Sequence, residues 1–127
     1  MKSAYVSCAY KNIPAADATS KQLLIDLSSS SSIRLFSVHF VPAAHSSAAA
    51  TSASSGVEIY GSDPDGGDSP FYEEKLFSGF YTGFTGFWNL NGPRVDPHGV
   101  FFSDASDIYV KGVGVGIAFV SITYQLG

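Results

Sequence analysis

The chain has 127 residues, which is enough for one domain with a core of useful size. Charged residues make up only 14% of it, against about 25% in a typical soluble domain. The formal net charge is −4, and the seven Lys and Arg residues are scattered singly along the chain. The sequence therefore lacks the basic stripe that is typical of a nucleic-acid-binding protein. So few charges favour a surface that is partly covered in an assembly, although a Ser- and Gly-rich surface is an alternative.

Composition also bears on the cellular compartment. The N-terminus lacks the apolar core of a signal peptide, and no apolar run approaches the ~20 residues that span a bilayer. We therefore expect a cytoplasmic origin. Cys8 is the only cysteine, so no internal disulfide can form, and its position in a predicted strand favours a buried, inert thiol.

The first third of the chain predicts short strands separated by loops. Residues 4–10 alternate as a strand, and residues 12–20 contain a proline and small residues that indicate a loop. Residues 22–27 are an apolar run that fits either a strand or one helical turn, because periodicity cannot decide over so few positions. The serine run at 28–32 predicts a flexible loop.

Residues 33–41 predict a clear strand, which Pro42 ends because proline lacks the amide that a ladder requires. Alternation predicts two faces, Phe36, Val38 and Phe40 on one, and Ile33, Leu35, Ser37, His39 and Val41 on the other. Since both faces are largely apolar, we expect a central strand covered on both sides. The Ala- and Ser-rich segment 43–55 predicts an exposed loop, either a spacer or a contact.

The middle of the chain predicts three strands. Residues 57–60 and 71–77 fit a strand pair, joined by an acidic, glycine-containing turn at 61–70. Residues 80–90 fit a strand interrupted by glycines, followed by turn sequences up to residue 99.

The last quarter carries the strongest strand signals. Residues 100–102 and 108–110 predict short strands around a turn at 103–107, and residues 117–124 are rich in β-branched and aromatic residues. The glycines of 112–116 predict a turn or bulge, because no helix follows them as it would in a dinucleotide site. The face that we assign to the core is Ala118, Val120, Ile122 and Tyr124.

The pattern amounts to about eight short strands at ~8–12-residue spacing, with no convincing helix. It predicts one all-β domain over residues 1–127, an antiparallel β-sandwich of jelly-roll type. Residues 33–41 and 117–124 should be its central strands.

Three carboxylates gather in the 61–70 turn, from Asp63, Asp65 and Asp68. Calcium prefers such oxygen ligands, but the spacing differs from that of an EF-hand loop, and a solvated acidic turn explains the same residues. We expect no metal to be required for folding.

Other catalytic chemistry has little support. His39, His45 and His98 share no ligand spacing, and His39 fits a hydrogen-bonded core or interface residue. The sequence contains no nucleophile elbow, zinc-protease motif or phosphate-binding glycine loop. We therefore expect no enzyme and no cofactor.

The most unusual local composition lies at residues 79–88, where five aromatics occur within ten residues. Such a run fits a protein interface or a sugar-stacking platform, although all five rings could simply fill the core. The candidate interface residues are Phe80, Tyr81, Phe84, Phe87 and Trp88.

The C-terminal pattern carries a resemblance. The segment Gly99-Val100-Phe101-Phe102, then residues 108–110, a glycine turn and a last strand ending in Tyr124 resembles the C-terminal signature of small β-sandwich virion proteins of tailed bacteriophages. The likeness covers about residues 33–124.

The resemblance implies a capsid decoration or cement subunit that binds and stabilises the assembled phage head. It also implies a homotrimer, with other copies and the major capsid protein or other virion proteins as partners. The protein would reside in the virion after assembly in the host cytoplasm, and would bind neither nucleic acid nor membrane. The alternative is a carbohydrate-binding, lectin-like module, or a tail or fibre component.

Overall fold

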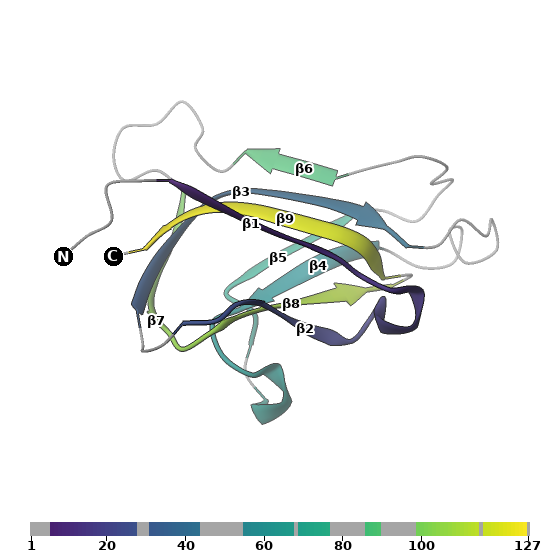
Figure 1. Ribbon diagram of the computed structural model, residues 1–127, viewed down its shortest axis with the longest axis horizontal. Coiled ribbons are helices and arrows are strands. Elements are labelled where there is room, and N and C mark those ends of the chain that lie inside the picture. The colour runs from purple at the N-terminus through teal and green to yellow at the C-terminus, as the bar shows by residue number, and fades with distance from the viewer. Residues whose placement is uncertain are drawn as a thin grey trace.

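The computed structural model describes residues 6–27, 31–43, 55–67, 69–76, 86–89, 99–114 and 116–126. Within these ranges the chain forms strands in two antiparallel sheets that pack face to face, with two short 3-10 helices between strands (Figure 1). The predicted all-β sandwich is confirmed.

The five-stranded sheet has the order β1 (Ser7–Asn12), β9 (Ile117–Leu126), β3 (Ser31–Pro42) and β6 (Gly86–Asn89), with β7 (Val100–Ala105) also paired to β3. The four-stranded sheet has the order β2 (Lys21–Ile25), β8 (Ile108–Val113), β4 (Ser55–Tyr60) and β5 (Tyr72–Leu76). The short helices are η1 (Ala15–Asp17) and η2 (Pro64–Gly66).

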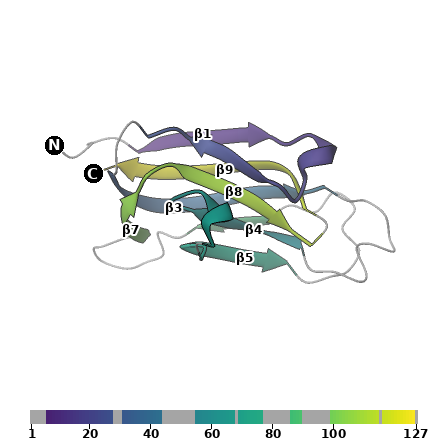
Figure 2. The ribbon, with the colours of Figure 1, turned by 90° about the horizontal axis from the view of Figure 1, so that it is seen from below.

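The topology is that of a jelly roll. Most consecutive strands belong to different sheets, so β1, β9 and β3 run side by side in one sheet (Figure 2), while β2, β4 and β8 lie in the other layer (Figure 1). β7 pairs with residues 31–35 of β3 and β6 pairs with residues 37–40, so the two short strands share one position at the edge. Counted by position, the sandwich therefore has the eight strands expected of a jelly roll.

The core lies between the sheets. Its fully buried large side chains come from β3, β4, β8 and β9: Ile33, Leu35, Val38, Phe40, Val57, Ile59, Ile108, Val110, Ile117, Val120 and Ile122. Burying each of these side chains contributes roughly 1.5–3 kcal/mol. As predicted, β9 and β3 are central, since β9 lies between β1 and β3, and β3 lies between β9 and the β6/β7 edge.

The predicted faces of β3 are wrong. Its register with β9 shifts between Leu35 and Ser37, which leaves Phe36 as the extra residue of a β-bulge. The bulge moves the later residues to the opposite face, so Ile33 and Leu35 share the core with Val38 and Phe40. The outer face of β3 is half-buried, so the strand is not covered on both sides as predicted.

Cys8 also differs from the prediction, because its thiol is exposed. β1 is an edge strand whose alternate residues face outward, and Cys8 occupies one of these outward positions opposite Thr123. Residues 22–27 form the strand β2 and not a helical turn. The turn expected at 103–107 is shorter, since β7 continues to Ala105.

The glycine-rich turn between β8 and β9 is confirmed, and it has a packing role. Gly114 and Gly116 have positive φ, and the Ile117 amide donates a 2.9 Å hydrogen bond to the carbonyl of Ala18. A Cβ built on Gly112 would lie 2.1 Å from that carbonyl oxygen. Glycines here let the chain after η1 lie directly against the turn.

Candidate functional site

Nine residues of β1, β9 and β3 form a regular grid on the outside of the five-stranded sheet, which we call the outer face. Pairing across the three strands gives three rows, Cys8–Thr123–Ser37, Tyr10–Ser121–His39 and Asn12–Phe119–Val41. The residues between them on β9, Val120 and Ile122, are buried in the core, so the grid lies on the opposite side of the sheet.

Three aromatic rings contact one another across this grid. The Tyr10 ring stacks beside Phe119 with centroids 6.3 Å apart, and Phe119 meets His39 edge-on at 5.7 Å. Tyr10 is 67% exposed, which is unusual for a ring of this size. The three rings therefore form one aromatic row over three strands, in which Tyr10 is exposed and Phe119 and His39 are half-buried.

The rest of the outer face is mostly polar, with Val41 as an apolar member. The Ser37 and Thr123 hydroxyls are hydrogen-bonded at 2.5 Å, and the nine grid residues include no carboxylate, lysine or arginine. Beyond the grid, the guanidinium of Arg34 lies 4.8 Å from the ring centroid of Phe101, which is 52% exposed. This cation–π contact extends the aromatic surface onto β7.

The outside of the four-stranded sheet is different, because charged residues gather there. Glu58 of β4 pairs in register with Lys111 of β8 on one side and with Glu73 of β5 on the other. The Tyr60 hydroxyl donates a 2.8 Å hydrogen bond to Glu58. Burial of the Tyr60 hydroxyl is the larger cause, and this hydrogen bond the smaller one, of a pKa raised to about 12 for Tyr60.

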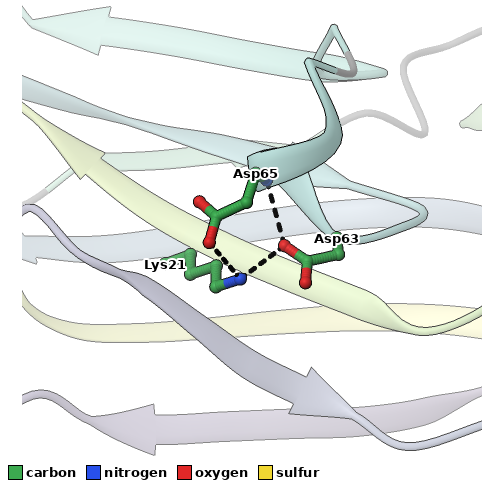
Figure 3. Close-up of polar contacts among 3 residues, drawn as sticks. All are labelled: Lys21, Asp63 and Asp65. Atoms are coloured by element: carbon green, nitrogen blue, oxygen red, sulfur yellow. Dashed lines mark hydrogen bonds and ion pairs between the residues drawn. The ribbon is translucent and has the colours of Figure 1, made fainter.

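A second charged feature connects β2 with η2 (Figure 3). The Lys21 ammonium lies 2.5 Å from a carboxylate oxygen of Asp63 and 2.6 Å from one of Asp65. Asp63 also caps η2 by accepting a 3.0 Å hydrogen bond from the Asp65 amide. The hydrogen bond from Lys21 is the main cause of the lowered pKa of Asp63. In turn, the hydrogen bonds to Asp63 and Asp65 raise the pKa of Lys21 to about 12.

This geometry bears on the acidic turn that could have held a cation. Lys21 places an ammonium between Asp63 and Asp65, where a cation would otherwise bind. No group of three or more potential metal ligands occurs within the described ranges, while Asp68 lies outside them. That folding needs no metal stays a prediction.

The predicted aromatic interface is described only in part. Phe80, Tyr81 and Phe84 lie outside the described residues, as do His45 and His98 and most of the 43–55 segment. Phe87 and Trp88 belong to β6, where their backbones pair with His39 and Val38. The Tyr10–Ser121–His39 row therefore continues in register to Phe87 at the next strand.

The sequence pattern did not single out Tyr10 or Phe119, because each lies in a different strand and neither is in an aromatic cluster of its own.

Comparisons of the chain with models of protein families, with curated proteins and with solved structures found no match. Among the described residues, none forms a helix with the length and hydropathy to cross a membrane.

Proposed function

We propose that this protein is a non-enzymatic structural subunit of a phage virion, most plainly a decoration or cement subunit of the head. The carrying observation is the uncharged aromatic outer face, which spans three strands and leaves Tyr10 67% exposed. A large aromatic ring this exposed, stacked beside a second ring, is typical of a surface that a partner covers.

Two further points support the proposal. The jelly roll is a fold that viral capsid proteins use, although the same fold serves lectins and enzymes. The C-terminal segment that resembles the virion proteins forms β7, β8 and β9, and β9 contributes the middle column of the outer face. The homotrimer rests on the resemblance and stays a prediction.

Co-sedimentation with purified capsids of the encoding phage tests this function. Wild-type protein should pellet with the shells, while Tyr10→Ser should bind at least tenfold more weakly. Leu23→Ser is the matched control, because Leu23 is a 39% exposed side chain on the edge strand of the other sheet. Failure of wild-type protein to bind shells, together with its absence from virions by mass spectrometry, would contradict the proposal.

The aromatic-glycine run offers a separate test of the contact. Phe84→Ser and Phe87→Ser, made singly, should leave a folded monomer by circular dichroism, and one of them should abolish assembly or shell binding. If both changes only unfold the chain, these rings are core and the run is no contact.

Carbohydrate binding is the second candidate, favoured by one specific observation. The Tyr10 ring stacks beside Phe119 among the Ser, Thr and Asn side chains of the grid, and aromatic faces flanked by hydroxyls and amides suit a neutral sugar. Affinity electrophoresis in host polysaccharide distinguishes the two candidates. Retardation that Tyr10→Ala removes would favour a lectin-like module, whereas a decoration subunit should migrate unchanged.

A further inference from the structure

We infer that the outer face is a self-association surface, which packs against the outer face of a second copy of this chain about a two-fold axis. The inference goes beyond the virion proposal, because it concerns the isolated protein and does not require a capsid.

Charge distinguishes the outer face from the other described surfaces. Glu58, Glu73 and Lys111 lie in register across the outside of the four-stranded sheet. Burying that surface against a flat partner would desolvate several charges, each at a cost of several kcal/mol unless paired. The outer face carries less of this penalty, since its nine grid residues include no carboxylate, lysine or arginine and the Arg34 guanidinium beside them lies over the Phe101 ring.

Two sheet edges are also guarded against pairing with another strand. Lys11 of β1 pairs in register with the buried Val120, and its ammonium donates a 3.3 Å hydrogen bond to the Leu23 carbonyl of β2. A charged residue on the inward side of an edge strand opposes strand addition. The second guarded edge belongs to the four-stranded sheet, where the edge strand β5 presents the exposed Glu73.

The chemistry of the outer face favours a second copy as its partner. A partner with carboxylates or ammonium groups would bury them opposite an uncharged grid that offers no counter-charge. A second outer face instead supplies matching groups. Its aromatic rings can stack with Tyr10 and Phe119, and its hydroxyls can exchange hydrogen bonds with those of Ser121 and its neighbours. The same patch on both copies makes the contact isologous, which closes at a dimer.

The available area sets the strength of the contact. Ten residues of β9 at about 3.3 Å per residue and four strand positions about 4.8 Å apart give the outward side of this sheet an area on the order of 600 Å², which includes Arg34 and the fourth strand position beyond the nine grid residues. A standard stable interface buries roughly 800 Å² per partner. We therefore expect a dimer that dissociates on dilution and is reinforced where many copies are held close together.

Sedimentation equilibrium of the full chain, from micromolar to millimolar concentration, tests the inference. Wild-type protein should show a monomer–dimer equilibrium. Tyr10→Glu should lower the association constant at least tenfold, because it places a carboxylate in the contact opposite no cation. Leu23→Glu, an equal change at a half-exposed site on the other sheet, should stay within about twofold of wild type.

Cross-linking gives a second readout that uses the native thiol. Cys8 belongs to the outer face, so a short bismaleimide should link wild-type copies into dimers and should fail on Tyr10→Glu. The control Cys8→Ser/Glu73→Cys moves the thiol to the exposed Glu73 position of the opposite sheet and should not be cross-linked, although its outer face still pairs. Circular dichroism of every variant checks that the fold is retained.

Several outcomes would overturn the inference. A wild-type protein that stays monomeric at millimolar concentration, or equal weakening by Leu23→Glu, would show that the outer face does not pair. A trimer of the isolated protein would require two different patches in contact, so it would exclude this pairing and would support instead the homotrimer that the resemblance implies. Shell or polysaccharide binding by a strictly monomeric protein would contradict self-association while leaving the corresponding proposed function intact.

Discussion

At the scale of single residues, two kinds of position constrain this fold most tightly. The first is glycine where backbone segments approach closely, as at Gly116, where φ is +86° and an added Cβ would lie 2.4 Å from the Ala18 carbonyl oxygen. The second is Lys21, whose single ammonium connects β2 to both carboxylates of the η2 turn. One constraint is steric and the other electrostatic, so they should respond to different perturbations.

Gly116→Ala should destabilise the protein by more than about 2 kcal/mol, because it combines a left-handed backbone with a clash against a main-chain oxygen. Gly67→Ala is the matched control, since Gly67 has a φ of +84° but open space around its Cβ position. We expect it to cost about 1 kcal/mol. Urea unfolding measures both values, and equal losses would show that close packing against Ala18 contributes nothing.

Lys21→Met should change the pH dependence of stability. Because the pKa of Asp63 is lowered in the folded state, its pairing with Lys21 stabilises the fold above about pH 4 and is lost as the pH falls through that lowered pKa. The raised pKa of Lys21 extends the contribution upward, until it is lost as the pH rises through about 12. Thermal unfolding from pH 2 to pH 7 should therefore show a loss in acid that is smaller in Lys21→Met than in wild type, because Asp63 in the variant keeps only its hydrogen bond from the Asp65 amide.

The pair is solvent-exposed, so salt should screen it. In 1 M NaCl the acid-dependent difference between wild type and Lys21→Met should disappear, while Lys11→Met serves as a control for removal of another amine. An acid loss of equal size in wild type and Lys21→Met would assign the effect to groups other than this pair.

At the scale of elements, β3 shows how far the sequence could be used for prediction. Its existence, its central position and its end near Pro42 follow from β-branched and apolar composition. The bulge at Phe36 could not be predicted, because it depends on how β9 pairs with β3 and no local signal such as glycine marks it. One extra residue exchanged the faces of the strand from residue 36 onward.

The outer face was missed for a related reason. Its rings come from β1, β3 and β9, so the aromatic row exists only after the register of three strands is known. Local density instead drew attention to residues 79–88, whose link to this face is the pairing of Phe87 with His39. Alternation did place Cys8 and Tyr10 on one side of a strand, but it could not say that this side faces solvent on an edge strand.

Two aromatic-to-small substitutions should separate the two faces of the five-stranded sheet. Phe40→Ala should cost about 3–5 kcal/mol, because Phe40 is fully buried in the central strand β3. Tyr10→Ser should stay within about 1 kcal/mol, because its ring is mostly in solvent. Chemical denaturation measures both changes in the free energy of unfolding. A large loss for Tyr10→Ser would mean that the outer aromatic row stabilises the fold and is not a surface kept for binding.

At the scale of the whole molecule, the sandwich divides its surface by chemistry. One sheet presents rings and hydroxyls outward, with Arg34 beside the grid, and the other presents Glu58, Glu73, Lys21 and Lys111. The charged side chains named on the strands therefore lie mainly on the four-stranded sheet. The acidic η2 turn belongs to the charged side.

Removal of divalent cations should leave the whole molecule unchanged. The Lys21 ammonium already occupies the position between Asp63 and Asp65, so excess EDTA should not shift the melting temperature measurably. Added calcium should not shift it either, and the Lys21→Met variant is the comparison in which calcium has room to bind. A large fall in melting temperature with EDTA in wild type would contradict this expectation.

The pairing of β1 with β9 also has a mechanical consequence. Ser7 lies opposite Tyr124, so the two ends of the chain leave the sandwich side by side (Figure 1). A force that pulls those ends apart loads the β1–β9 hydrogen bonds one after another, as in a zipper, and not all at once in shear. β1 should peel away at low force in single-molecule stretching while β9 stays held by β3. Since β1 carries Tyr10, traction on the termini would strip one column from the outer face before the core yields.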